Sequence, residues 1–182
     1  TGVAKVKTGT KVHFLPYREI FNLTAYKYDT PAHPLRELAF LNKGLQITLT
    51  DERATDSKTG EAKHSDFKYN GGIADFIKHL NRGKAVLHDK PIHFEAEREW
   101  NDGVLTMEVA LQYNDGYSEN VFSFANNINT VDGGTHLTGF RTALTRTINA
   151  FGQSAGLFKD VKENLTGDDV REGLTAVVSV KV

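Results

Sequence analysis

The chain has 182 residues, a net charge of −1 at pH 7 and no cysteine. This length allows one domain with a buried core, and the balanced charge excludes a surface that is basic throughout, so any contact with nucleic acid has to be local. The lack of cysteine excludes disulfides, thiolate zinc sites and cysteine nucleophiles, and it suits a reducing, cytoplasmic location. No apolar stretch approaches the roughly 20 residues of a membrane span, so we expect no contact with a membrane.

The N-terminal region predicts a strand, then a short helix. Apolar and polar residues alternate over 11–16, which is typical of a half-buried strand. Residues 34–44 predict a helix, because Pro34 suits a first helical turn and Gly44 suits a C-terminal stop.

A hairpin and a second helix follow. Leu45 to Thr50 alternates as a strand with one solvated face, residues 51–63 predict an exposed tip, and Phe67 lies on the return strand. The apolar spacing over 73–80 predicts a short helix behind a glycine pair.

Three strands are predicted next, over 92–96, 104–113 and 120–126. The Asn-Asp-Gly sequences at 101–103 and 114–116 predict hairpin turns between them. We expect one alternating core set on this sheet, made of Leu105, Met107, Val109 and Leu111 with Phe122 and Phe124 as neighbours.

The stretch 132–151 is strongly amphipathic and predicts a helix with Thr135 as its N-cap. Arg141 lies on the flank of its apolar stripe, and Arg146 points almost opposite. The glycines ahead of the helix could cradle a phosphate, but a core helix with a well-made cap explains them better, because no P-loop lysine follows. The apolar stripe consists of Leu137, Phe140, Leu144, Ile148 and Phe151.

Residues 166–169 predict a second helix N-terminus, and the apolar run over 174–182 predicts a central strand. The mixed order of hairpins and helix-to-strand crossovers predicts an α+β fold with helices on one face of a mixed sheet.

Sites for independent chemistry are weakly supported. The seven histidines are scattered without metal-ligand spacing, and no nucleophile-elbow sequence is present. Adjacent Asp168 and Asp169 are better explained as first-turn acids than as an acid–base pair. Lys159, Lys162 and Arg171 are best explained as a solvated face.

Several longer stretches carry a resemblance to a known family. They are TGTKVHF at 8–14, RELAFLN at 36–42, VALQYNDG at 109–116, DGGTHL at 132–137, TGDDVREGL at 166–174 and AVVSVKV at 176–182. In this order they resemble the ATPase subunits of bacterial type IIA topoisomerases, the gyrase B family, over essentially the whole chain.

The resemblance implies a transducer domain over 17–182, preceded at 1–16 by the last strand of an ATPase domain. In the family this domain is a mixed sheet backed by helices, related to the second domain of a small-subunit ribosomal protein, with a left-handed βαβ crossover. It relays the nucleotide state to the DNA gate, for strand passage and negative supercoiling, and it lines the cavity for the transported duplex. No catalytic residue and no metal ligand is implied for this chain.

The resemblance also implies site residues and ligands. Gly9 and Thr10 match the edge of the nucleotide pocket, and Arg141 matches an arginine that faces the DNA cavity; Arg146 is a second candidate contact. The full-length protein would use ATP and magnesium, but its ATP-binding motifs lie upstream and its Gln-Thr-Lys loop downstream, so we expect no nucleotide on this chain. The implied partners are a DNA duplex, the gyrase A protein and a second copy through the ATPase domain.

The chain begins at Thr1 and ends in a strand-like run, so we expect it to be an excised piece of a larger protein. Three alternatives stay open: a topoisomerase IV ATPase protein, a stand-alone nucleic-acid-binding module of the same fold, and an independent hydrolase.

Overall fold

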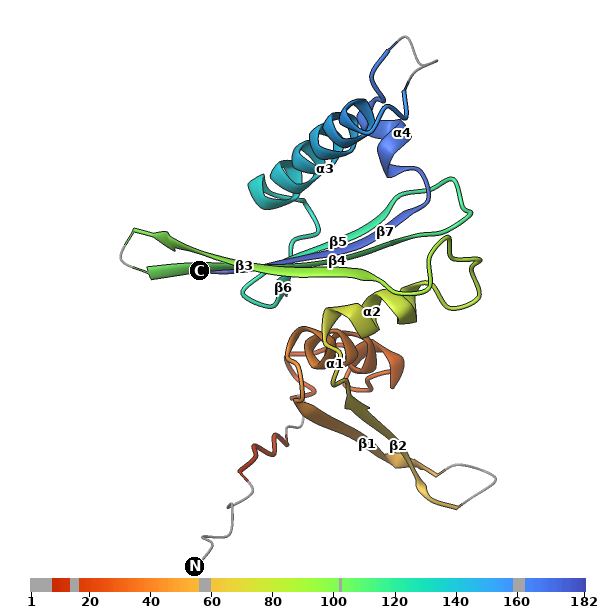
Figure 1. Ribbon diagram of the computed structural model, residues 1–182. Helices are drawn as coiled ribbons and strands as arrows, with labels where there is room; N and C mark the ends of the chain where they lie inside the picture. The colour runs from red at the N-terminus through yellow and green to blue at the C-terminus, as the bar shows by residue number, and fades with distance from the viewer. Residues whose placement is uncertain (1–7, 14–16, 56–59, 102, 159–162) are drawn as a thin grey trace, which may run out of the picture.

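The computed structural model describes residues 8–13, 17–55, 60–101, 103–158 and 163–182 (Figure 1). The elements follow in the order α1 (Asp29–Leu41), β1 (Gln46–Thr55), β2 (Ala62–Lys68), α2 (Ile73–Leu80), β3 (Ile92–Trp100), β4 (Gly103–Tyr113), β5 (Asn120–Ala125), β6 (Ile128–Asn129), α3 (Thr135–Ser154), α4 (Gly167–Arg171) and β7 (Leu174–Lys181). Among the described residues, no helix is both long and apolar enough to cross a membrane.

The main sheet has five strands in the order β3-β4-β7-β5-β6. All neighbouring pairs are antiparallel except β5 and β7, which are parallel and joined through β6, α3 and α4. The predicted central position of β7 is confirmed, since Leu174 to Val180 is buried throughout. The predicted hairpin at 114–116 is wrong. The strand β7 pairs with β4 on one side and with β5 on the other, so β4 and β5 are not neighbours in the sheet. The handedness of the crossover stays a prediction.

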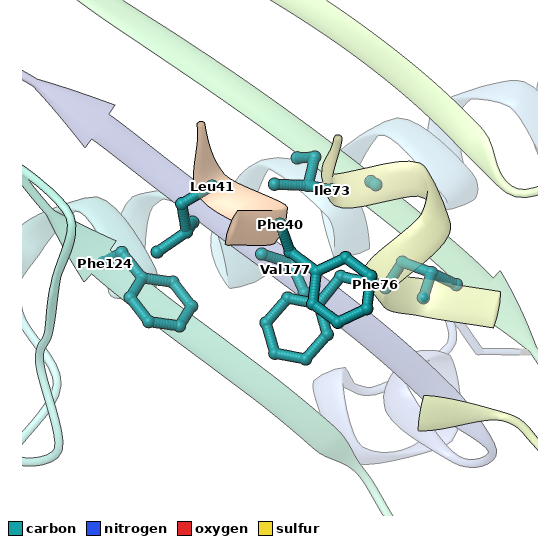
Figure 2. Close-up of a cluster of buried hydrophobic side chains, with 8 residues drawn as sticks. Phe40, Leu41, Ile73, Phe76, Phe124 and Val177 are labelled. Atoms are coloured by element: carbon teal, nitrogen blue, oxygen red, sulfur yellow. The ribbon is translucent and has the colours of Figure 1, made fainter. Parts of the chain in front are cut away.

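The mixed α+β sheet is confirmed, but its helices cover both faces (Figure 1). On one face α1 and α2 pack against the sheet, and the Phe40 ring stacks on that of Phe76 at 4.7 Å (Figure 2). On the other face Phe140 and Leu144 of α3 pack against the sheet. The expectation of helices on one face is therefore wrong, because strand side chains alternate and both sets are apolar.

The predicted single core set is divided in the same way. Val109 and Leu111 belong to the α3 side, whereas Phe124 lies on the α1 and α2 side with Ala110 and Val177. The residues were correctly chosen as apolar and sheet-forming, but β4 and β5 each contribute to two cores.

The first helix begins earlier than predicted. It runs from Asp29, so that Pro34 lies inside it and not in its first turn. The helix tolerates this proline because Ala32 and Leu35 pack against the β1–β2 hairpin. Gly44, with φ of 81°, lies beyond the end of the helix, as its role in the stop predicts.

The predicted strand over 11–16 is wrong as far as it is described. Residues 8–13 are exposed and form no strand, and none of the described strands pairs with them; residues 14–16 lie outside the described residues. A strand needs a neighbour to satisfy its backbone hydrogen bonds.

The two predicted helix caps differ in outcome. The N-cap of α3 is Gly134, which offers no side chain, so Thr135 is the first helical residue and not the cap. The cap of α4 is confirmed as a capping box, in which Thr166 Oγ1 accepts from the Asp169 amide and Asp169 Oδ2 accepts from the Thr166 amide at 2.7 Å. The α3 stripe is right at Leu137 but wrong at Phe151, which is 65% exposed.

Candidate nucleic-acid interface

Arg141 projects from α3 toward the connection between β4 and β5. Its Nε donates to Oε1 of Glu119 at 2.8 Å, and its side chain is 40% exposed. The side chain thus packs along a rigid helix while part of the guanidinium reaches solvent. This geometry agrees with the flank position that periodicity predicted for it.

Glu119 holds a second arginine. Its Oε2 accepts from Arg171 Nε at 3.2 Å, and a terminal nitrogen of Arg171 donates to Asp168 Oδ1 at 2.7 Å. Two arginines and two carboxylates therefore alternate in one network that joins α3, the β4–β5 connection and α4. Sequence analysis missed Glu119, because no local pattern links it to residues 22 and 52 positions away.

Arg141 also borders an open groove of about 420 Å³ at the outer edge of β5. The loop between β6 and α3 closes one side of it, and Thr130 fixes this loop by donating its amide to the Ser123 carbonyl at 2.8 Å. The groove walls include Val121, Phe122, Val131, Asp132 and Leu137. The charged side chains that line the groove are Arg141 and Asp132, and its openness suits a surface contact rather than the enclosure of a small molecule.

Arg146 lies elsewhere on the helix. It follows Arg141 by five positions, which corresponds to a rotation of about 140° around α3. It is exposed, and no ion pair joins it to another residue in the described part of the chain. The structure therefore does not bring the two candidate arginines together.

Gly9 and Thr10 lie exposed in the segment ahead of α1. A Cβ added at Gly9 would meet no atom within 4 Å, so the described residues build no cradle for a nucleotide around it. These two residues alone do not fit ATP or magnesium, and no group of three or more candidate metal-ligating side chains occurs among the described residues.

One hydrogen-bond chain superficially resembles a catalytic relay. Thr50 Oγ1 lies 3.0 Å from His64 Nδ1, and His64 Nε2 lies 3.1 Å from Asp66 Oδ2. All three side chains lie on an exposed face of the β1–β2 hairpin, and neither described cavity adjoins them. An exposed chain of hydrogen bonds on a pair of strands is not the concave, convergent arrangement that a catalytic site requires.

The acidic pair at the start of α4 is used structurally. Hydrogen bonds from the Thr166 hydroxyl and amide lower the pKa of Asp169, and Asp168 pairs with Arg171. An acid–base pair would instead need a proton shared between the carboxylates or one raised pKa. Lys159 and Lys162 lie outside the described residues.

These features define a class of protein: an α+β domain in which a rigid helix holds a partly exposed arginine within an ion-pair network. The family model described as DNA gyrase B matches residues 72–182. The DNA gyrase B protein of Halalkalibacterium halodurans is 55% identical over 177 residues, which are 97% of this chain and 26% of that protein. The DNA gyrase B protein of Clostridium acetobutylicum is 55% identical over 174 residues, 96% of this chain and 26% of that protein.

The chain belongs to the DNA gyrase B family. It spans about a quarter of the length of these two relatives. Among solved structures, the 43K ATPase domain of Thermus thermophilus gyrase B in complex with an aminocoumarin has a TM-score of 0.72 and 36% identity, covering 92% of this chain and 43% of that one. The topoisomerase IV ATP binding domain of Francisella tularensis has a TM-score of 0.66 at 21% identity, covering 92% of this chain and 41% of that one, and shows the shared fold alone.

Proposed function

We propose that residues 17–182 are the transducer domain of a DNA gyrase B protein, with 1–16 as the end of its ATPase domain. In this role the chain couples ATP binding and hydrolysis to DNA strand passage and negative supercoiling in the cytoplasm. The observation that carries the proposal is Arg141, a half-exposed cation held on a rigid helix beside an open groove, in a chain of this family.

Arg141 would contact the phosphate backbone of the transported duplex. Its described hydrogen bond uses Nε alone, which leaves the two terminal nitrogens available for a phosphate. Such a contact carries no sequence information, which suits a protein that must pass any duplex. The gyrase A protein and a second gyrase B copy are the proposed protein partners of the full-length chain.

The proposal is tested by Arg141→Gln in the full-length protein, reconstituted with its gyrase A partner. We expect folding and basal ATP hydrolysis to stay nearly intact, while DNA-stimulated ATP hydrolysis and supercoiling weaken. The slope of log affinity against log salt concentration should fall by about one unit, as for the loss of one phosphate contact. Arg146→Gln is the matched control. If only the Arg146 variant impaired DNA-coupled activity, the opposite side of α3 would face the duplex.

Gly9 and Thr10 would border the nucleotide pocket only together with the ATPase domain, where ATP and magnesium would bind. Their exposure supports this, because a partner surface has to complete any such pocket. The 182-residue chain alone should show no thermal shift with a non-hydrolysable ATP analogue, and the full-length protein should show one. A saturable shift of the chain alone at micromolar nucleotide would contradict this part of the proposal.

A further inference from the structure

Glu119 lies between two arginines that belong to different helices. Its side chain is 25% exposed, and each of its carboxylate oxygens accepts a hydrogen bond from one arginine: Arg141 at 2.8 Å and Arg171 at 3.2 Å. The carboxylate thereby joins the helix that carries the proposed DNA contact to the short helix that leads into the central strand β7.

The Arg171 end of this link is well fixed. Its side chain is 18% exposed and is also held by Asp168. It packs closely over the backbone of Gly167, where an added Cβ would lie 2.5 Å from Arg171 Nη1. The fixed Arg171 therefore holds the Glu119 carboxylate in place, so Glu119 can restrain the more exposed Arg141.

We propose that Glu119 is a positioning residue for the DNA contact of Arg141, an inference that rests on the proposed function above. By accepting from Nε, Glu119 holds the guanidinium plane so that both terminal nitrogens stay available to a phosphate. An arginine that is already ordered loses less side-chain freedom when it binds a phosphate.

A carboxylate near DNA also has an opposing effect, because it repels phosphates. Glu119 belongs to a network of two arginines and two carboxylates, however, in which Asp168 and Glu119 balance Arg171 and Arg141, so the network as a whole adds no net charge to the field that DNA meets. Ordering a long side chain is worth roughly twofold to tenfold in affinity, whereas partly exposed charges are screened by salt. Positioning should therefore outweigh repulsion. The two effects have opposite signs, so the direction of the change in DNA affinity when Glu119 is replaced shows which one dominates.

The test measures the affinity of the full-length protein for a duplex of mixed sequence, by fluorescence anisotropy at fixed salt, for Glu119→Gln and Glu119→Ala. Both variants remove a negative charge, so electrostatics alone predicts tighter binding. Positioning predicts binding that is about twofold to tenfold weaker. Asp168→Asn is the matched control: it removes a charge from the same network without touching Arg141, and it should not weaken binding.

A double-variant cycle separates this inference from the proposed function. In an Arg141→Gln background, Glu119→Gln should cause no further loss of affinity, because there is no guanidinium left to position. Tighter or unchanged binding of the Glu119 variants, or a loss that persists in the Arg141→Gln background, would overturn the positioning role while leaving the DNA contact in place. If Arg141→Gln itself left the affinity unchanged, the proposed function would fail, and the inference with it.

Discussion

The backbone carbonyl of Asn114 faces the Cα of Gly173 so closely that a Cβ at Gly173 would lie 2.4 Å from the carbonyl oxygen. The Asn114 amide also donates to the Gly173 carbonyl at 3.0 Å. These contacts join the end of β4 to the start of β7, where β7 enters the sheet between strands that come earlier in the chain. With φ of 70°, Gly173 also has a backbone conformation that L side chains rarely adopt.

Gly173→Ala should therefore be strongly destabilising. The positive φ costs roughly 1–2 kcal/mol for a residue with a Cβ, and the backbone contact adds to it, so we expect a loss of more than about 3 kcal/mol in the free energy of unfolding. Gly44→Ala is the control, because Gly44 has φ of 81° and nothing within 4 Å of an added Cβ. Urea denaturation of both variants checks the difference. Equal losses would show that the close approach relaxes without cost.

A buried polar network lies next to this junction. Thr175 Oγ1 donates to Asn81 Oδ1 at 2.7 Å, and Asn81 Nδ2 donates to Gln112 Oε1 at 2.9 Å. Asn114 Nδ2 completes the network with bonds to Asn81 and Thr175. Its members lie on α2, β4 and β7 or just beyond them, and all four are buried.

Thr175→Val tests how much this network contributes. Removing the hydroxyl takes one donor from a buried amide oxygen, so we expect a loss of about 1–2 kcal/mol in the free energy of unfolding. Thr48→Val makes the same change on exposed β1, where Thr48 Oγ1 donates to Asp66 at 2.7 Å, and should stay within about 0.5 kcal/mol of the parent. Similar losses in the free energy of unfolding at the two positions would mean that the contribution of the Thr175 hydrogen bond to stability does not depend on its burial.

The face of α3 that packs on the sheet can be tested in the same way. Leu144 packs against the core on this side, although it is only half-buried, so Leu144→Ala should cost about 2 kcal/mol. Phe151→Ala should cost less than about 0.5 kcal/mol, because Phe151 is 65% exposed. Thermal unfolding of the two variants gives the comparison. A larger loss of stability for Phe151→Ala than for Leu144→Ala would mean that Phe151 is buried, as the spacing of the apolar stripe predicts.

The sequence was informative where structure depends on neighbours along the chain. The spacing in 73–80 predicts α2, the acidic turn after Thr166 predicts a helix N-terminus, and the β-branched run from Leu174 predicts a central strand. It misled where a residue's partner is remote. Nothing near Asn114 indicates that β7 will enter beside β4, so a turn sequence that often makes hairpins makes a crossover connection instead.

In the candidate site, too, the residues placed by local pattern could be predicted from the sequence, and those placed by remote contacts could not. Helical periodicity puts Arg141 on a flank of α3 and Arg146 on the other side, and the structure agrees. Glu119 could not be found from sequence, because its importance comes from two contacts across the fold. The end of the α3 stripe failed for a different reason. Phe158 folds back over Gly152, where an added Cβ would lie 2.4 Å from its ring, so this ring and not Phe151 covers the helix there.

A small cavity of about 50 Å³ lies between α1, α2 and the sheet, and Glu37 lines it together with His33, Arg36, His79 and hydrophobic side chains. Burial raises the pKa of Glu37, and His33, 3.4 Å away, lowers it in part. Burial first, and then Arg36, Arg82 and His33, lower the pKa of His79. The cavity thus favours the neutral forms of both residues.

The raised pKa of Glu37 fixes the sign of its effect on stability. Between its ordinary pKa and the raised one, the folded chain binds more protons than the unfolded chain, so the free energy of unfolding falls as pH rises through that window. Above the window, ionised Glu37 is a net cost that its pair with the 70% exposed His33 offsets little. Glu37→Gln should therefore raise the urea midpoint at pH 7, and the gain should vanish at a pH below both pKa values. Glu97→Gln makes the same change on the exposed strand β3 and should leave the urea midpoint at pH 7 nearly unchanged. If Glu37→Gln lowered the midpoint at pH 7, the pair with His33 would outweigh burial, and the two groups would stabilise the cavity in their charged forms.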